Sequence, residues 1–213
     1  MATELADAPT KPISDTPEER SVSAPLMTVD QFLEQADTVG LELINGRVEE
    51  QPTSELTCFN GPLVVSALVD YSRTHGGRAF QDDTEYRCFG DRRLRKPDAS
   101  WIAADRLSPL KARGVLGIPP DLAVEVISPG DTIDGLDTKL DDYAAAGVRM
   151  VWIVKPLRRT VEIIDHTDGS RHLFAEADTL DGGSVLPGFA RPVADLLPDP
   201  SEVEPPPEPS GDE

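Results

Sequence analysis

Two acidic residues, Asp98 and Glu125, lie beside or within apolar stretches of the sequence, where a carboxylate needs a partner. Glu125 lies within the run 122–127, whose other members are all apolar, and Asp98 follows Lys96-Pro97 at the start of a second short apolar stretch. A buried carboxylate is costly unless it is paired, hydrogen-bonded or bound to a metal. If neighbouring strands bring Asp98 and Glu125 to one sheet edge, they form an oxygen-rich site for a hard divalent cation such as Mg²⁺, with Mn²⁺ as the alternative ion.

Lys139 would complete such a site. The chain contains five lysines against fifteen arginines, and Lys139 lies in the first turns of the helix expected after the Glu125 strand. From there its ammonium group can reach back over the strand end, where it would hold an attacking water or stabilise charge on phosphorus. A cation on Asp98 and Glu125 would polarise a phosphate and activate water. The three residues therefore predict metal-dependent hydrolysis of a phosphodiester.

Each of these residues also has an ordinary structural interpretation. Glu125 could form a salt bridge with an arginine, and Asp98 could cap the start of a strand after proline. Lys139 could be a solvated helix residue. Glu42 alternates with two leucines and could simply face solvent on its strand. The basic cluster 92–96 could be a solvated loop that balances an acidic domain, or a strip that steers phosphates beside Asp98.

The elements that would carry these side chains follow from hydrophobic periodicity. The run 122–127 predicts a strand buried on both faces, residues 136–144 predict a helix that ends at Gly147, and residues 148–154 predict a second buried strand. A strand, a helix and a strand in this order form a crossover unit. At least part of the sheet should therefore be parallel and covered by helices.

The rest of the core predicts shorter elements. A helix follows Thr28, a hairpin turns at Asn45-Gly46, a helix spans about 61–73, one or two strands lie in 79–89, and a strand covers 99–102. Residues 103–120 predict a long loop, and residues 160–174 a closing hairpin around Asp168-Gly169. The fold class is therefore α/β, with a mixed sheet flanked by helices and a C-terminal hairpin.

Acidic residues dominate the composition. The chain of 213 residues carries 39 Asp and Glu against 20 Lys and Arg, a net charge of −19. Residues 1–25 and the proline-rich stretch 198–213 are acidic, lack a repeating apolar pattern, and are expected to be disordered tails around one domain, 26–197. The domain itself also carries excess negative charge. Bulk electrostatics would therefore repel nucleic acid, and its binding would need a metal ion or a local basic strip.

Cysteine content and apolar patterning bear on the compartment. Two cysteines exclude a disulfide framework and a zinc site built from several cysteines. Residues 1–10 contain no apolar core of a secretory signal, and the longest apolar stretch, 63–69, is far shorter than a bilayer span. We expect a soluble cytoplasmic protein with no membrane partner.

Several stretches of the chain resemble the Uma-two (Uma2) family of restriction endonucleases. The matching segments cover about residues 27–197: MTVDQFL at 27–33, LELING at 41–46, KPD at 96–98, PDLAVEVISP at 120–129, and 139–154. The region from 120 to 154 is the most specific. This family belongs to the PD-(D/E)XK nuclease superfamily, so the resemblance implies a restriction-endonuclease-like core that acts on nucleic acid, with DNA as the expected substrate.

The resemblance also implies roles for particular residues. Asp98 and Glu125 would be the metal carboxylates, and the carbonyl of Val126 could complete the metal shell. The superfamily lysine two positions after the glutamate is Ile127 here, and Lys139 resembles the family's relocated lysine. Glu42 would be the early glutamate that orients the site or reaches a second metal. Many relatives carry a histidine early in the helix after the first hairpin, and the segment 55–60 has none.

Two functions from different classes follow. The first is a Mg²⁺-dependent endonuclease, with Asp98 and Glu125 on the metal, Lys139 on the water, and Glu42 in support. The second is a binding or regulatory module on the same scaffold that does not cleave, an alternative motivated by the acidic core. In a third interpretation Glu125 is structural and the chain is a plain α/β scaffold. Folds of this kind often pair to cut two strands, so a homodimer is also considered, although no interface stripe stands out.

Overall fold

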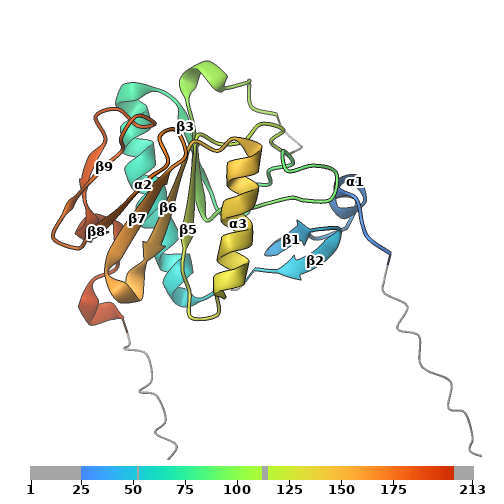
Figure 1. The fold of residues 1–213 in the computed structure, drawn as a ribbon, viewed down its shortest axis with the longest axis horizontal. Coiled ribbons are helices and arrows are strands. Elements are labelled where there is room, and N and C mark those ends of the chain that lie inside the picture. The colour runs from blue at the N-terminus through green and yellow to red at the C-terminus, as the bar shows by residue number, and fades with distance from the viewer. Residues whose placement is uncertain (1–24, 52, 112–114, 204–213) are drawn as a thin grey trace, which may run out of the picture.

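The computed structural model describes residues 25–51, 53–111 and 115–203. A six-stranded sheet in the order β3-β4-β5-β6-β7-β8 forms its centre (Figure 1). The strands are β3 (Arg78–Gln81), β4 (Ala99–Ile102), β5 (Leu122–Val126), β6 (Met150–Lys155), β7 (Thr160–Asp165) and β8 (Ser170–Ala175). Only β5 and β6 pair in parallel, and the other neighbours are antiparallel. The mixed sheet and its crossover unit confirm the α/β prediction.

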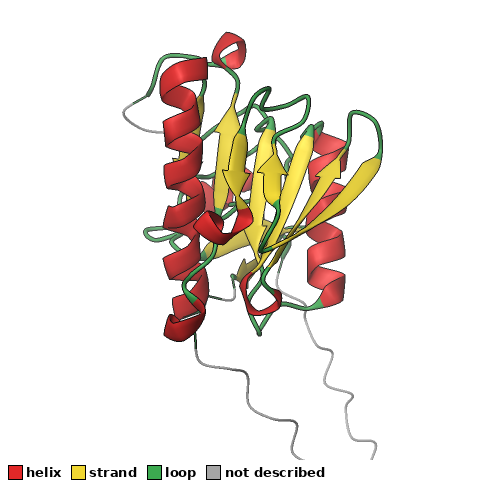
Figure 2. Ribbon diagram, turned by 90° about the vertical axis from the view of Figure 1, so that its left-hand side faces the viewer, coloured by secondary structure: helices red, strands yellow, loops and turns green. Residues whose placement is uncertain are grey.

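Two long helices cover opposite faces of this sheet (Figure 2). On one face, α2 (Glu55–His75) packs in a core with the side chains of Leu122, Val124 and Val126. On the other face, α3 (Ile133–Ala146) packs in a second core with Ala123. Because side chains alternate along a strand, Glu125 shares the α3 face with Ala123. The apolar run of β5 therefore supplies both cores and places one carboxylate under α3.

The predicted cap of the first helix and both predicted hairpins are present in the structure. Thr28 caps α1 (Val29–Leu33) with a capping box to Gln31. Asn45 and Gly46 have positive φ at the turn between β1 (Leu41–Ile44) and β2 (Arg47–Glu50), as a two-residue hairpin requires. The closing hairpin of β7 and β8 is also as expected.

Two sequence expectations differ from the structure. The second helix begins at Glu55 rather than near residue 61, because Ser54 forms a capping box with Thr57 and Pro62 is tolerated inside the helix. Of the stretch 79–89, only residues 79–81 belong to a strand, β3, since Asp83 adopts a positive φ just after it. Beyond it, Tyr86 forms only isolated bridges.

The segment 179–196, from β9 to η3, completes the core on the α2 face. The strands β9 (Thr179–Asp181) and β10 (Ala190–Pro192) form a small antiparallel sheet that the sequence did not indicate. The described residues also form four 3₁₀ helices, η1 (Ala104–Arg106), η2 (Pro156–Arg158), η3 (Val193–Leu196) and η4 (Pro200–Glu202). No helix in the described residues has the length and apolarity to cross a membrane. Of the two expected tails, 1–24 and 204–213 lie outside the described residues, and 198–203 include η4.

Candidate active site

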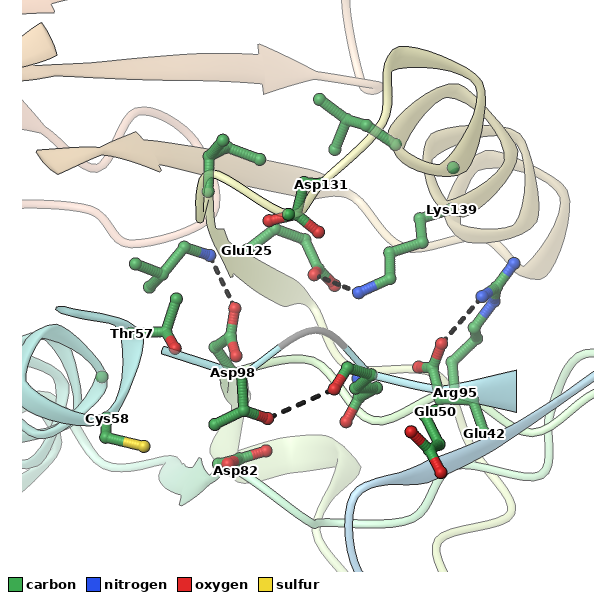
Figure 3. Close-up of a pocket in the computed structure, with 18 of the residues that line it drawn as sticks. Glu42, Glu50, Thr57, Cys58, Asp82, Arg95, Asp98, Glu125, Asp131 and Lys139 are labelled. Atoms are coloured by element: carbon green, nitrogen blue, oxygen red, sulfur yellow. Dashed lines mark hydrogen bonds and ion pairs between the residues drawn. The ribbon is translucent and has the colours of Figure 1, made fainter. Parts of the chain in front are cut away.

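A pocket of about 630 Å³ lies where α2, the start of α3, the β1–β2 hairpin and the ends of β3 to β5 meet (Figure 3). All five residues expected from the sequence line it: Glu42, Asp98, Glu125, Val126 and Lys139. They come from positions as far apart as β1 and α3. The fold therefore brings the expected carboxylates and the lysine to one place.

Glu125 is buried at the base of this pocket, with 3% of the residue exposed. Its Oε2 accepts a hydrogen bond from Lys139 Nζ at 2.7 Å, and its Oε1 accepts one from the hydroxyl of Tyr143. Lys139 and Tyr143 are four residues apart on α3 and so share one face of the helix. The ordinary interpretation, in which Glu125 pairs with an arginine, is wrong, because the partners are a lysine and a tyrosine.

The charges of this pair are set by burial and by each other. Burial raises the pKa of Glu125, and Lys139 opposes that shift. Burial would lower the pKa of Lys139, but the neighbouring carboxylates, with Glu125 first, raise it above its ordinary value. Lys139 is therefore protonated at neutral pH, and it is not the solvated helix residue of the ordinary interpretation.

Asp98 approaches from the start of β4. Its Oδ2 accepts a hydrogen bond from the Val126 N–H at 2.6 Å, which ties the end of β4 to the end of β5. Burial, followed by the repulsion of Glu125, raises the pKa of Asp98 to about 8. Such a shift between two acids in one pocket is typical of sites that bind a cation or move a proton.

The carbonyl of Val126 points to the same edge of β5 as the N–H of Val126. The N–H of the next residue, Ile127, donates to Val154 O at 2.8 Å, on the β6 side of the strand. Successive residues of a strand direct their N–H and C=O groups to alternate edges, so the Val126 carbonyl shares the edge on which Asp98 lies.

Glu42 does not face solvent as one interpretation held, since only 2% of it is exposed. Its Oε2 accepts from Arg95 Nη1 at 2.8 Å and its Oε1 accepts from the Lys96 N–H at 2.8 Å. Arg95 also donates to Asp142 Oδ2 on α3, at 2.6 and 2.8 Å. Glu42 therefore holds the segment that leads to Asp98, and through Arg95 it connects β1 with α3.

The basic cluster 92–96 is largely drawn into the molecule, and only Arg92 in it is exposed. Arg95 and Lys96 are each only 1% exposed. Arg93 donates to Asp142 and Asn45. The cause is a backbone bridge between Leu43 and Leu94, which draws the segment into the molecule. The solvated-loop interpretation is wrong for Arg95 and Lys96, because their carboxylate partners are not neighbours in sequence. A role of the cluster in steering phosphates stays a prediction.

Four further acids of the pocket, Glu49, Glu50, Asp82 and Asp131, were missed, together with Tyr143, the hydroxyl partner of Glu125. Tyr143 was identified only as part of a helix stripe, although its spacing of four from Lys139 was a usable signal. Asp82 lies below Asp98 in Figure 3, and burial raises its pKa. Asp131 closes the turn after β5 by accepting from the Ser128 N–H at 2.7 Å. Nothing in the local sequence marks Asp82 or Asp131 as members of the pocket.

The donor set fits a cation that keeps much of its water. Within the ranges that the structure describes, no cluster of three or more His, Cys, Asp and Glu side chains is arranged to hold a metal. Two carboxylates and one carbonyl, beside an open pocket, remain available. Mg²⁺ is commonly held in this way, by one or two carboxylates, several waters and the substrate phosphate.

Comparison with known proteins agrees with this fold. The model of the Uma2 family, described as "Putative restriction endonuclease", matches residues 29–194. A crystal structure from Anabaena variabilis ATCC 29413, described as a putative nuclease belonging to DUF820, is similar with a TM-score of 0.67 and 23% identity. The similarity covers 80% of this chain and 97% of that chain. No curated protein matches the sequence.

Proposed function

The chain belongs to the Uma2 family, and from this premise we propose that it is a metal-dependent endonuclease that hydrolyses phosphodiester bonds in DNA. The family supports a nuclease and hence a nucleic acid substrate. The cation, Mg²⁺ or Mn²⁺, and the choice of DNA are our additions. The observation that carries the proposal is the convergence of Asp98, Glu125 and Lys139 in one pocket, with Lys139 Nζ 2.7 Å from Glu125 Oε2.

In the proposed mechanism, Asp98, Glu125 and the Val126 carbonyl would hold the cation. When bound, a divalent cation polarises the scissile phosphate and lowers the pKa of a coordinated water. Lys139 orients the attacking water or stabilises negative charge on the phosphate oxygens. Because Lys139 is protonated, it acts as a hydrogen-bond donor and not as the base that accepts the proton of the water.

Glu42 is a positioning residue in this account. Both of its oxygens accept hydrogen bonds, one from Arg95 and one from the Lys96 N–H, two residues before Asp98. It therefore fixes the approach of Asp98 to the pocket. The orienting role that the family resemblance implied is the one that these contacts support, in preference to a role on a second metal.

The test is hydrolysis of bis(p-nitrophenyl) phosphate and of a DNA oligonucleotide by the full chain, with and without Mn²⁺ or Mg²⁺. We expect Asp98→Asn, Glu125→Gln and Lys139→Met each to lower the metal-dependent rate by about 100-fold or more, because each removes charge from the reacting centre. Circular dichroism and gel filtration check that the variants fold.

Lys155→Met is the matched control for the lysine variant. Lys155 forms a comparable pair with Glu162, at 2.6 Å, but it does not line the pocket. Its loss should leave the rate within a factor of about two. Unchanged metal-dependent hydrolysis in Asp98→Asn, Glu125→Gln and Lys139→Met would refute the proposal.

The excess of acids in the pocket favours a second candidate, a module that binds and does not cleave. Calorimetry with Mn²⁺ and an oligonucleotide separates the two. Metal and oligonucleotide binding without any hydrolysis would favour the binding module. Cytoplasmic localisation and pairing of two copies stay predictions, and an analytical ultracentrifugation run tests the pairing.

A further inference from the structure

The charge of the pocket is unfavourable to a long nucleic acid. Seven acidic side chains line it against two cationic ones, Arg95 and Lys139. Both cations are already ion-paired, Arg95 with Glu42 and Asp142, and Lys139 with Glu125. A duplex binds mainly through several lysines and arginines on its phosphates. The described lining of this pocket offers no unpaired cation for that purpose.

The size and walls of the pocket suit a small ligand. Its volume of about 630 Å³ lies within the usual range of sites for small molecules and cofactors. Besides Val126, five apolar residues line it: Ile44, Pro62, Val65, Ile127 and Leu136. All five are partly or fully exposed, and none is aromatic. The walls of the pocket thus combine carboxylates with aliphatic side chains.

We propose that this pocket accepts one unpaired nucleotide at a time, and that a fully paired duplex is not its substrate. The phosphodiester would lie at Asp98, Glu125 and Lys139, with the base against the aliphatic walls. A base that is unpaired or extruded can enter such a pocket, whereas a stacked base pair cannot. This inference rests on the proposed nuclease function and names the substrate class of the same site.

Binding of three matched oligonucleotides tests the inference. The probes are a fluorescein-labelled strand of 20 nucleotides, the same strand in a blunt duplex, and that duplex with one bulged nucleotide, each as DNA and as RNA. Anisotropy is measured with the wild-type chain in Ca²⁺, which also takes carboxylate oxygens as ligands, and a gel checks that the probes stay uncleaved during the measurement. We expect the single strand and the bulge to bind at least 10-fold more tightly than the blunt duplex, and the DNA and RNA arms identify the sugar.

The salt dependence provides a second readout. Because few cations are available, the log–log slope for the single strand should be no steeper than about −1.4, the value for two phosphates. Equal or tighter binding of the blunt duplex, or a slope that corresponds to five or more phosphates, would overturn the inference. Absence of binding by any probe would overturn it as well.

A bulky side chain on the pocket wall provides a third readout. Ser66 is exposed on α2 and lines the pocket, whereas Arg73 is exposed on nearly the same face of α2, two turns further on, and does not. We expect Ser66→Trp to weaken single-strand binding at least 10-fold and Arg73→Trp to change it less than 2-fold. Equal effects would contradict the placement of the nucleotide.

Hydrolysis of bis(p-nitrophenyl) phosphate by the wild-type chain separates this inference from the proposed function. If that compound is hydrolysed and the duplex is preferred, only the present inference fails. If nothing is hydrolysed but the single strand still binds as expected, the nuclease proposal fails and the ligand class stands.

Discussion

At the scale of single residues, Glu125 is the best-defined group of the site. Each of its oxygens has one donor from α3, Lys139 or Tyr143. Its orientation is therefore fixed before any cation arrives. A carboxylate with this support loses little freedom when it binds a metal, as outer partners of metal ligands commonly ensure.

Tyr143→Phe tests that support. The substitution leaves Glu125 Oε1 buried without its donor, and a hydrogen bond to a charged group contributes about 1.5–3 kcal/mol. We expect the free energy of unfolding in urea to fall by that amount. Tyr86→Phe is the control, because Tyr86 shares a buried bond of 2.7 Å with the neutral Ser100 and should lose only about 0.5–1.5 kcal/mol. A smaller loss at Tyr143 than at Tyr86 would contradict the account.

Asp98 predicts how stability depends on pH. Its pKa is about 8 in the folded chain against 3.8 as the ordinary value, so the folded state binds the proton more tightly. Stability from this group is present below about pH 4 and is lost as the pH rises toward 8. Without metal, the free energy of unfolding of Asp98→Asn, relative to that of wild type, should therefore rise by more than about 1 kcal/mol from pH 5 to pH 9. Urea unfolding at both values checks this, and a difference that does not change with pH would refute it.

The site residues that could be predicted from the sequence are those whose polarity or position is unusual for the element that carries them. Glu125 was found because its neighbours are apolar, and Lys139 because a helix follows that strand. Arg95 and Asp142 could not be found in this way, since they pair across 47 positions of the chain. No local pattern reports a partner at that distance.

At the scale of elements, the site depends on how the segment 92–96 connects β1 to α3. Arg95 contacts Glu42 on β1 and Asp142 on α3, and all three side chains are almost fully buried. Breaking a buried network by removing one partner is strongly destabilising, because the other charges remain without compensation. The segment therefore holds the hairpin and the helix together around the pocket.

Arg95→Leu should lower the free energy of unfolding by about 3–5 kcal/mol for this reason. Arg92→Leu, three positions earlier on an exposed residue, should change it by less than about 0.5 kcal/mol. Chemical denaturation of the two variants beside wild type measures both. Equal stability of Arg95→Leu and wild type would show that the network is not what joins these elements.

The elements with regular periodicity were predictable, and the irregular ones were not. The strand, helix and strand from β5 to β6 follow from apolar runs and from Gly147, whose φ of 84° ends α3. The start of α2 was missed because the residues that it buries in its first turns, Thr57, Asn60 and Gly61, are polar or small and leave no apolar stripe. The strands β9 and β10 were missed because each has three residues, too few for an alternating pattern to stand out.

At the scale of the whole molecule, the sheet separates two cores, and the pocket lies at the end where the α3 face meets the β1–β2 hairpin. The overall negative charge and the acidic pocket act together, because both repel a polyanion that brings no cation. A divalent ion would reduce that repulsion at the point of reaction. Acidic composition is thus compatible with a nuclease only if the cation is part of the site.

The location of Mn²⁺ in soaked crystals, determined by anomalous scattering, tests this central claim most directly. We expect one peak within about 2.0–2.3 Å of an oxygen of Asp98 and an oxygen of Glu125, the range for small divalent ions on carboxylates. The same soak of Glu125→Gln crystals should show no peak there. Manganese bound elsewhere in the wild-type crystal, with Asp98 and Glu125 free of it, would contradict the account.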